Sequence, residues 1–240
     1  DKYVEGELII RTMRWGLVPF FTKADSAADA CKEGWKMTNA RSDNLHRVHK
    51  RLLDTRRCAV FIEGFYEWLD DKKTGKKRPY FIRRKDQRPM LLAGLYDTWR
   101  GGADGKERII SCTVVTTDSN NELAWLHDRM PAILEGQRLD DWLDNGNVGF
   151  EDPRIQAILR PYNGNVDFYE VSNTVGNIKN NTAECMMPLS LFKEKQFASG
   201  LGKFFSPQAK TEPEGDGQTP AETKAHAAAE GSAGVGGGAS

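Results

Sequence analysis

A glutamate between two aromatic residues is the first candidate for chemistry. Glu67 lies in the segment Gly64–Trp68, directly after an apolar run that ends at Ile62. A carboxyl group enclosed by aromatic rings is suited to proton transfer near neutral pH, as a general acid or base. A glutamate that faces solvent from an edge strand would have the same sequence, so both interpretations stay open.

A histidine and an arginine form the second candidate. His127 is the only histidine between residues 50 and 195, and Arg129 follows two residues later, before Pro131. Imidazole changes its protonation state near neutral pH, and the forked guanidinium group binds phosphate well. A structural histidine in the core, next to a surface arginine, is the alternative explanation.

The third candidate is the segment 37–43, which contains Asn39 and Arg41. In an extended chain these two side chains face the same side, which places an amide beside a cation that can bind phosphate. Ser42 or Asp43 would then cap a following helix. Helix capping without any catalytic or binding role is the simpler reading of the same residues.

Two adjacent phenylalanines, Phe20 and Phe21, follow Pro19. Exposed aromatic rings of this kind can stack on the bases of single-stranded nucleic acid. Packing in the protein core would account for the same residues equally simply.

Composition excludes several classes of protein. The 240 residues carry 34 basic and 34 acidic side chains, so the chain is neither a polycation nor an acidic tail protein. No apolar run is long enough for a membrane span. The four cysteines are widely spaced, which argues against a zinc ribbon or a disulfide scaffold. His46 and His49 have no further ligand at a suitable spacing, so we expect neither a metal nor a cofactor.

Many strand-like segments and a few short helical ones predict the fold class. The expected strands are rich in β-branched residues and cover 57–62, 79–83, 90–99, 108–117 and 168–171. The expected helices cover 42–55, 120–126, 139–143 and 152–159. Without regular alternation of strand and helix, this pattern favours an α+β domain with a curved, barrel-like, mainly antiparallel sheet flanked by short helices.

The composition changes near Phe205. Residues 206–240 have no aromatic side chain, and Val235 is their only large aliphatic one, so we predict a disordered tail. We expect a single folded domain over 1–195. Residues 196–205 contain Leu201, Phe204 and Phe205, whose spacing is typical of a peptide that binds a sliding clamp. The alternative for this segment is a final element that packs on the core.

Taken in order, the motifs of this chain resemble the SRAP family (SOS-response-associated peptidase). The resemblance runs from about residue 11 to about residue 192 and rests on MRWGLVP at 13–19, NARSD at 39–43, RRC and GFYEW within 56–68, LAGLYDTW at 92–99, TVVTTDSN at 113–120, HDRMPAIL at 127–134, and VSNTVGN and NNTAEC within 171–185. It implies protection of abasic sites in single-stranded DNA, by a covalent thiazolidine between the lesion and an N-terminal cysteine.

The resemblance also implies roles for individual residues. Glu67 is similar to the acid or base that assists sugar ring opening and imine formation. His127 resembles the residue that moves protons at the sugar and helps to reverse the crosslink. Asn39 resembles the residue that orients the N-terminal nucleophile.

DNA contacts are carried over in the same way. Arg41 and Arg129 resemble the clamps on the phosphates that flank the lesion. Phe21 and Trp35 fall where the family places aromatic wedges that unstack the DNA.

The chain departs from the family pattern at its start, because it begins at Asp1 and its four cysteines are all internal. We therefore expect an N-terminally incomplete sequence that cannot form the thiazolidine as written. A non-catalytic reader of lesions or modified cytosine, which has lost the nucleophile, is the alternative. A cysteine peptidase would need an internal Cys–His pair, and Cys58 in an apolar strand is a poor candidate.

The expected partners follow from these roles. They are single-stranded DNA with an abasic site and, through Leu201, Phe204 and Phe205, a sliding clamp. We expect a monomer that does not contact membranes. Its expected location is intracellular, in the nucleus if the source is a eukaryote and otherwise in the cytoplasm.

Overall fold

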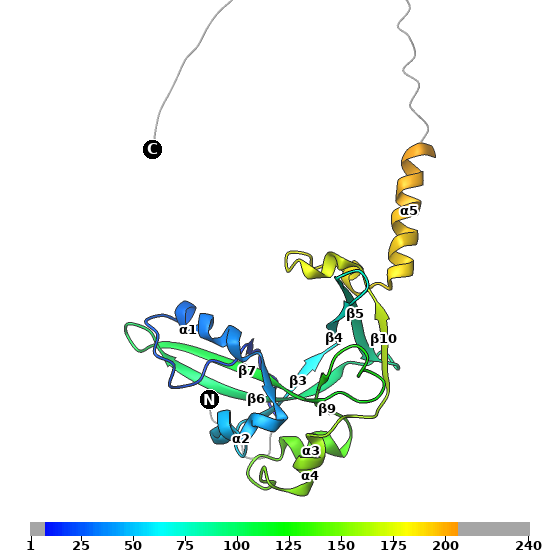
Figure 1. The fold of residues 1–240 in the computed structure, drawn as a ribbon. Coiled ribbons are helices and arrows are strands. Elements are labelled where there is room, and N and C mark those ends of the chain that lie inside the picture. Colours follow the sequence, from blue (N-terminus) through cyan, green and yellow to red (C-terminus); the bar gives the residue numbers. More distant parts are fainter. Residues whose placement is uncertain (1–7, 206–240) are drawn as a thin grey trace, which may run out of the picture. The chain divides into compact units, whose positions relative to one another are not determined.

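The computed structural model describes residues 8–205, except for the side chains of Trp35 and of residues 201–205. The chain forms an α+β fold with mostly antiparallel strands and short helices (Figure 1), which confirms the predicted class. The described strands belong to two sheets, one of seven strands and one of three.

Two long antiparallel strands are the centre of the seven-stranded sheet. These are β6 (Met90–Gly101) and β7 (Glu107–Asp118), which run side by side in Figure 1. Strand β3 (Arg57–Ile62) pairs with β6, whereas β1 (Arg14–Trp15) and β2 (Asn39–Arg41) pair in parallel with β7. The predicted strands 57–62, 90–99 and 108–117 are therefore confirmed.

Two short strands continue the sheet where β6 and β7 separate. Strand β8 (Arg129–Pro131) pairs with β7, and β9 (Ile133–Leu134) pairs with β6. Thr116 of β7 is opposite Arg41 on one edge and Pro131 on the other edge. The sheet thus brings residues 39–41 and 129–131 to the same end of β7, although they lie far apart along the chain.

The three-stranded sheet consists of β4 (Gly64–Asp71), β5 (Lys76–Arg84) and β10 (Val166–Glu170). The chain passes from the first sheet into this one at Gly64, where β4 approaches β5 very closely. A Cβ atom at Gly64 would lie 2.5 Å from the carbonyl oxygen of Ile82 and 2.5 Å from the ring of Phe81. Only glycine fits at this position, which fixes where β4 begins and therefore where Glu67 lies.

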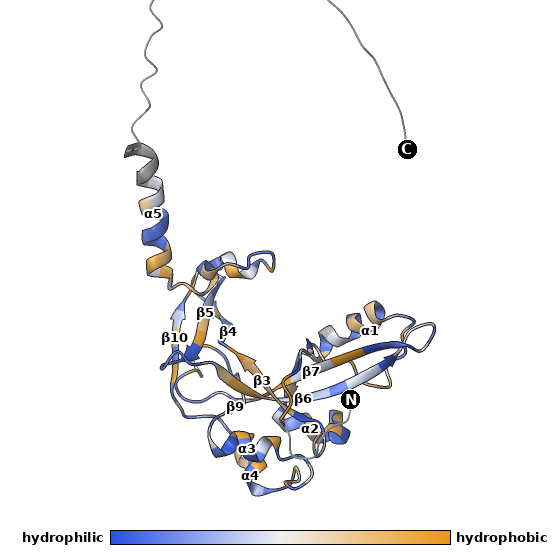
Figure 2. Ribbon diagram, turned by 180° about the vertical axis from the view of Figure 1, so that it is seen from behind, coloured by the Kyte–Doolittle hydropathy of each residue, from blue (hydrophilic) through white to orange (hydrophobic). Residues whose placement is uncertain are grey.

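The two faces of the seven-stranded sheet pack into different parts of the core. Ala40 and Val115 belong to the cluster that includes Trp142, which the short helices cover. Val114 belongs to the other cluster, which contains side chains of the three-stranded sheet such as Ile82. Strand β3, between these regions, is hydrophobic through most of its length (Figure 2).

The helix predicted at 42–55 is wrong, because the structure has three short pieces there. They are a 3-10 turn η2 (Ser42–Asn44), the helix α2 (Leu45–Val48) and a second turn η3 (Lys50–Leu52). His49 interrupts the helix, with φ −119° and ψ 13°. The His49 side chain is buried. The backbone conformation that places the imidazole in the core is not helical, so the helix ends there.

The segment 120–126, also predicted as a helix, forms consecutive turns. The Asn120 side chain explains this difference. Its Oδ1 accepts a hydrogen bond from the Leu123 amide at 2.9 Å, and its Nδ2 donates to the Tyr162 carbonyl at 2.8 Å. An asparagine that binds the backbone in this way offers an alternative to helical hydrogen bonds.

The other helical segments agree better with the sequence. The predicted helices at 139–143 and 152–159 correspond to α3 (Gln137–Leu143) and α4 (Pro153–Ile158), and the Asp152 side chain caps α4. Helix α1 (Ala27–Gly34) was not predicted, nor were the turns η1 (Trp35–Met37), η4 (Asn173–Gly176) and η5 (Ala183–Met186).

The C-terminal part of the described chain is helix α5 (Leu189–Phe205), which includes the backbone of the proposed clamp peptide. The side chains of Leu201, Phe204 and Phe205 lie outside the described residues, as does the whole predicted tail at 206–240. Within residues 8–205, none of the helices has both the length and the apolar character that a membrane span requires.

Candidate functional site

A small hollow brings together three of the residues selected from the sequence. Glu67, His127 and Arg129 line it with Ser119, above a floor of apolar side chains: Phe65, Ile82, Leu123, Leu126 and Met130. The enclosed space is about 10 Å³, room for about one water molecule, and the hollow is otherwise open to solvent. Ligand cavities are much larger, about 300–1,000 Å³, so the hollow is a shallow depression in the surface.

Glu67 reaches the hollow from the middle of β4. It is half-buried, and its Oε1 accepts a hydrogen bond from the Trp68 amide at 3.1 Å. Tyr80 is its cross-strand neighbour on β5 and packs edge-to-face against Trp125, with the ring centroids 5.1 Å apart. The carboxylate therefore has one aromatic neighbour and an open side, which suits transfer of a proton to a bound molecule.

His127 is held by the turn that precedes β8. Its Nδ1 accepts a hydrogen bond from the Arg129 amide at 3.0 Å and lies 3.1 Å from Asp128 Oδ1. An Nδ1 that accepts a hydrogen bond leaves the proton of the neutral ring on Nε2. When the ring is doubly protonated, Asp128 can accept from Nδ1 instead. The side chain is 44% exposed, so solvent can supply or remove the proton.

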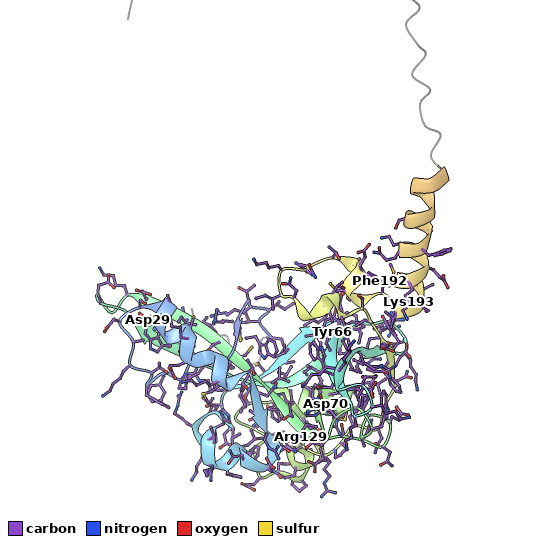
Figure 3. All side chains as sticks on the ribbon, turned by 45° about the horizontal axis from the view of Figure 1, so that its top comes forward. Asp29, Tyr66, Asp70, Arg129, Phe192 and Lys193 are labelled. Atoms are coloured by element: carbon purple, nitrogen blue, oxygen red, sulfur yellow. The ribbon has the colours of Figure 1, made fainter. Side chains whose placement is uncertain are left out.

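Arg129 is fixed by contacts to three neighbouring segments, at the place labelled in Figure 3. Its Nη1 donates to Asp118 at 2.6 Å, and its Nη2 donates to Ser42 Oγ at 3.3 Å and to the Thr116 carbonyl. Only 10% of the side chain is exposed. The guanidinium group is thus pre-oriented, which lowers the entropic cost of binding an anion.

Asn39 and Arg41 face the hollow side of the seven-stranded sheet. They are opposite Val114 and Thr116, and Val114 packs in the cluster that includes Ile82, whereas Ala40 faces the other way. Both side chains are exposed. The expectation that Asn39 and Arg41 share one side is therefore confirmed.

The charge of Arg41 is balanced by a carboxylate. Its Nε and Nη2 donate to Asp43 at 3.1 and 2.6 Å, and this pairing lowers the pKa of Asp43. The two side chains are each 55% exposed, so the pair is weak in water and can exchange for a phosphate.

Phe21, which was selected from the sequence, does not line the hollow. Phe21 is 69% exposed and packs edge-to-face against Phe20. The Phe20 amide donates to the buried Asp97, and Arg51 lies 4.1 Å above the Phe20 ring. The Trp35 backbone is in η1, and its side chain lies outside the described residues.

Two of the four internal cysteines, Cys58 and Cys112, are unsuited to nucleophilic chemistry. Burial raises the pKa of the Cys58 thiol to about 12 and also raises the pKa of Cys112. A thiol with such a pKa is protonated at neutral pH and is a weak nucleophile. No cysteine lines the hollow that His127 shares with Glu67. Both findings argue against an internal Cys–His peptidase site. In the part of the chain described, no three His, Cys, Asp or Glu side chains gather as a metal site.

Sequence reasoning missed one residue at this site, Ser119, and one in the adjoining aromatic group, Trp125. Ser119 lines the hollow, and its signals were its position just beyond the predicted strand 108–117 and its place in the motif TVVTTDSN at 113–120. Trp125 is 45% exposed and packs against Tyr80 and Phe168, next to the floor residue Leu126. We did not select Trp125 from the sequence because we expected residues 120–126 to form a helix.

Comparison with known protein families identifies the family of this chain. The family model for SOS response associated peptidase (SRAP) matches residues 3–178. The chain belongs to the SRAP family. Similar proteins include the abasic site processing protein HMCES of Xenopus tropicalis, 36% identical over 211 residues, which cover 79% of this chain and 60% of that protein.

Relatives are also found in a yeast and a bacterium. The abasic site processing protein YMR114C of Saccharomyces cerevisiae is 36% identical over 187 residues, 75% of this chain and 48% of that protein. The abasic site processing protein YoaM of Bacillus subtilis is 34% identical, covering 72% of this chain and 73% of that protein. This chain thus spans about half to three quarters of the length of these relatives.

Solved structures show the same fold. A crystal structure of a protein from Bacteroides thetaiotaomicron superposes with a TM-score of 0.63 at 27% identity, covering 73% of this chain and 75% of that one. A protein from Bordetella bronchiseptica superposes with a TM-score of 0.55 at 27% identity, covering 68% and 77%.

Proposed function

We propose that this protein recognises and shields abasic sites in single-stranded DNA. The observation that carries the proposal is the convergence of Glu67, His127 and Arg129 on one small hollow. The relatives named as abasic site processing proteins support it. DNA as the substrate also supports the expected intracellular location, in the nucleus or the cytoplasm.

The proposed reaction is a condensation at the lesion sugar. The amine of an N-terminal cysteine, which is not among these 240 residues, adds to the C1 aldehyde, and loss of one water gives an imine. The cysteine thiol then adds to the imine carbon while the nitrogen takes a proton, which closes a thiazolidine ring. An α-amino group has a pKa of about 7.7–8.0 and is partly neutral at cellular pH, as this addition requires.

The residues at the hollow match the proton transfers of this reaction. Ring opening needs a proton on the ring oxygen and removal of a proton from the C1 hydroxyl, and Glu67 can accept or donate one of them. His127 can carry the second proton, because solvent reaches its ring. Asn39, on the same side of the sheet, would orient the incoming amine through its side-chain amide.

The arginines would hold the DNA backbone on either side of the lesion. Arg41 and Arg129 are carried by strands on opposite edges of β7. Guanidinium groups bind phosphates without reading bases, as a lesion sensor requires. Phe21 is exposed and would stack on a neighbouring base.

A crosslinking experiment tests the function. The protein with its native N-terminal cysteine is mixed with a single strand that bears one abasic site, and the products are separated on a denaturing gel. We expect a slow-migrating covalent band, slower band formation with Glu67→Gln, and impaired reversal with His127→Ala. Absence of the band with the unsubstituted protein would refute the proposal. An intact strand of the same sequence is the control.

The clamp contact is a further part of the proposal. Leu201, Phe204 and Phe205 would bind the clamp as a short apolar face. Retention of the protein on immobilised sliding clamp, lost when both phenylalanines become alanine, would support this contact. Equal retention of the two proteins would refute it.

A further inference from the structure

A buried carboxylate that does not line the hollow has no part in the proposed reaction. Asp97 lies on β6, with 4% of its side chain exposed. Its Oδ2 accepts hydrogen bonds from the Phe20 amide at 2.9 Å and from the Arg51 guanidinium group, and its Oδ1 accepts from the Thr98 amide at 2.8 Å. Burial of a charge is costly unless its partners compensate for the lost water. The two contacts outside β6 therefore show what Asp97 holds in place.

The segment that Asp97 holds is a tight turn with two aromatic residues at its tip. The Thr22 amide donates to the Pro19 carbonyl at 3.0 Å, so Phe20 and Phe21 are the two central residues of the turn. These two side chains are 51% and 69% exposed. Central positions of turns usually carry glycine, asparagine, aspartate or serine, and exposed apolar side chains that lie together can mark a contact surface. Turn formation alone therefore does not account for two phenylalanines at this tip.

Buried side chains fix the turn on both sides of the tip. The Val18 amide donates to Ser111 Oγ at 2.8 Å, and Trp99 Nε1 donates to the Thr22 carbonyl at 2.8 Å. Ser111 and Trp99 are both fully buried. Ser111 is opposite Asp97 in the pairing of β6 with β7, and Trp99 lies two residues beyond Asp97 on β6. Three side chains from one face of these strands thus hold residues 18, 20 and 22.

Arg51 links the buried carboxylate to the aromatic rings. Its guanidinium carbon lies 4.1 Å from the centroid of the Phe20 ring, which is a cation–π contact. Phe20 in turn packs edge-to-face against Phe21, with the ring centroids 5.4 Å apart and an angle of 85° between the rings. Phe20 is therefore supported by Arg51, and Phe21 is the more exposed of the two rings.

The chemistry of the tip favours single-stranded nucleic acid as its partner. The Arg51 side chain is 48% exposed, and the exposed Lys23 directly follows the turn. Aromatic rings beside positive charges are typical of proteins that bind single strands, because bases stack on the rings and the charges attract the phosphates. A turn that is already fixed increases affinity, because the ring loses little conformational freedom when a base stacks on it.

We propose that Asp97 is a positioning residue, which together with Arg51 holds the turn so that Phe21 stacks on a base of the bound DNA strand. This inference rests on the proposed function and deepens it, because it names the residues that would fix the aromatic contact. It also gives a role to the buried polar groups of Asp97 and Trp99 in the motif at 92–99, which the proposed reaction does not use.

A double-mutant cycle in binding tests the inference without the covalent step. The probe is a fluorescent single strand with one borohydride-reduced abasic site, whose C1 alcohol cannot form an imine. Affinity is measured by anisotropy for the unsubstituted protein, for Asp97→Asn, for Phe21→Ala and for the doubly substituted protein. We expect Phe21→Ala to bind at least about 5-fold more weakly, as for the loss of one stacked base. Asp97→Asn should bind about 2–5-fold more weakly, because a loosened ring keeps part of its stacking.

The doubly substituted protein separates positioning from other effects. If Asp97 acts through Phe21, Asp97→Asn costs no further affinity once Phe21 is alanine. An equal loss of affinity in both backgrounds would overturn the inference, because Asp97 would then act on the fold or on the charge of the protein and not through the ring.

A second variant keeps the inference testable if Asp97→Asn does not fold. Arg51→Gln removes the cation above Phe20 at a surface position, and Arg47→Gln on the neighbouring helix α2 is its matched control for the loss of one exposed charge. We expect Arg51→Gln to weaken binding more than Arg47→Gln does, and this difference should disappear in the Phe21→Ala background. Equal losses with the two glutamine variants would overturn the inference.

An intact strand of the same sequence separates this inference from the proposed function. If the unsubstituted protein prefers the abasic strand and Asp97→Asn binds that strand equally tightly, only the inference is overturned. If the unsubstituted protein does not distinguish the two strands, the proposed function is overturned, and the cycle of Asp97 with Phe21 still decides the inference on its own.

Discussion

Replacing the buried Arg57 with methionine should destabilise the whole fold. Arg57 is 2% exposed, and its guanidinium group donates four hydrogen bonds of 2.7–3.0 Å to backbone carbonyls. The acceptors are the carbonyl groups of Leu53, Trp142, Asp144 and Val148. The side chain therefore joins the start of β3 to the segment that ends α3.

The size of the stability loss in Arg57→Met follows from two opposing contributions. Each carbonyl left buried without a donor costs about 1–3 kcal/mol. Methionine, however, removes the cost of burying a charge, which is also what lowers the pKa of Arg57. The four unpaired carbonyls together outweigh this relief, which leaves a net loss of about 3–5 kcal/mol. We expect this loss, which corresponds to a fall of roughly 10 °C in Tm for a domain of this size.

Urea unfolding followed by tryptophan fluorescence measures the loss, with Arg47→Met as the matched control. Arg47 is exposed on α2, so its substitution should change stability by less than about 0.5 kcal/mol. If Arg57→Met loses less than about 1 kcal/mol, the four carbonyl bonds do not stabilise the fold as argued.

Three further predictions concern charge and reactivity. Burial lowers the pKa of His49 below its usual 6.5, so the unfolded chain binds more protons below pH 6.5 and stability should fall as the pH drops. His49→Gln should flatten this dependence in unfolding curves between pH 7 and 5, and an unchanged slope contradicts the argument. At pH 8 iodoacetamide should modify Cys31 before Cys58, whose pKa is about 12; mass spectrometry showing Cys58 modified first would exclude this. Arg41→Ala should reduce the salt dependence of single-strand binding, with the slope of log K against log salt falling by about 0.7, and an equal slope would remove Arg41 from the phosphate contacts.

Local sequence predicted the strands of the fold well. The run Arg57–Ile62 coincides with β3, and the β-branched residues at 108–117 lie within β7. In these segments, the burial of apolar side chains and the backbone preference of β-branched residues both favour a strand. The strands β2, β8 and β9 have only two or three residues each. They exist because β7 offers pairing partners, which no short window of sequence reveals.

The site could be predicted only in part, for a related reason. Glu67, His127 and Arg129 stood out by residue type, and the structure brings them to one hollow. Ser119 did not stand out, because a serine after a strand is common in turns. Its place at the hollow depends on the pairing of β8 with β7 beside it.

The pairing of β7 on both edges at Thr116 has a mechanical consequence. Neither β2 nor β8 can shift its register on β7 without breaking hydrogen bonds. The sheet therefore fixes the positions of the strands that carry Arg41 and Arg129. Under the proposed function, a single strand that binds both arginines has to match this fixed arrangement with its phosphates.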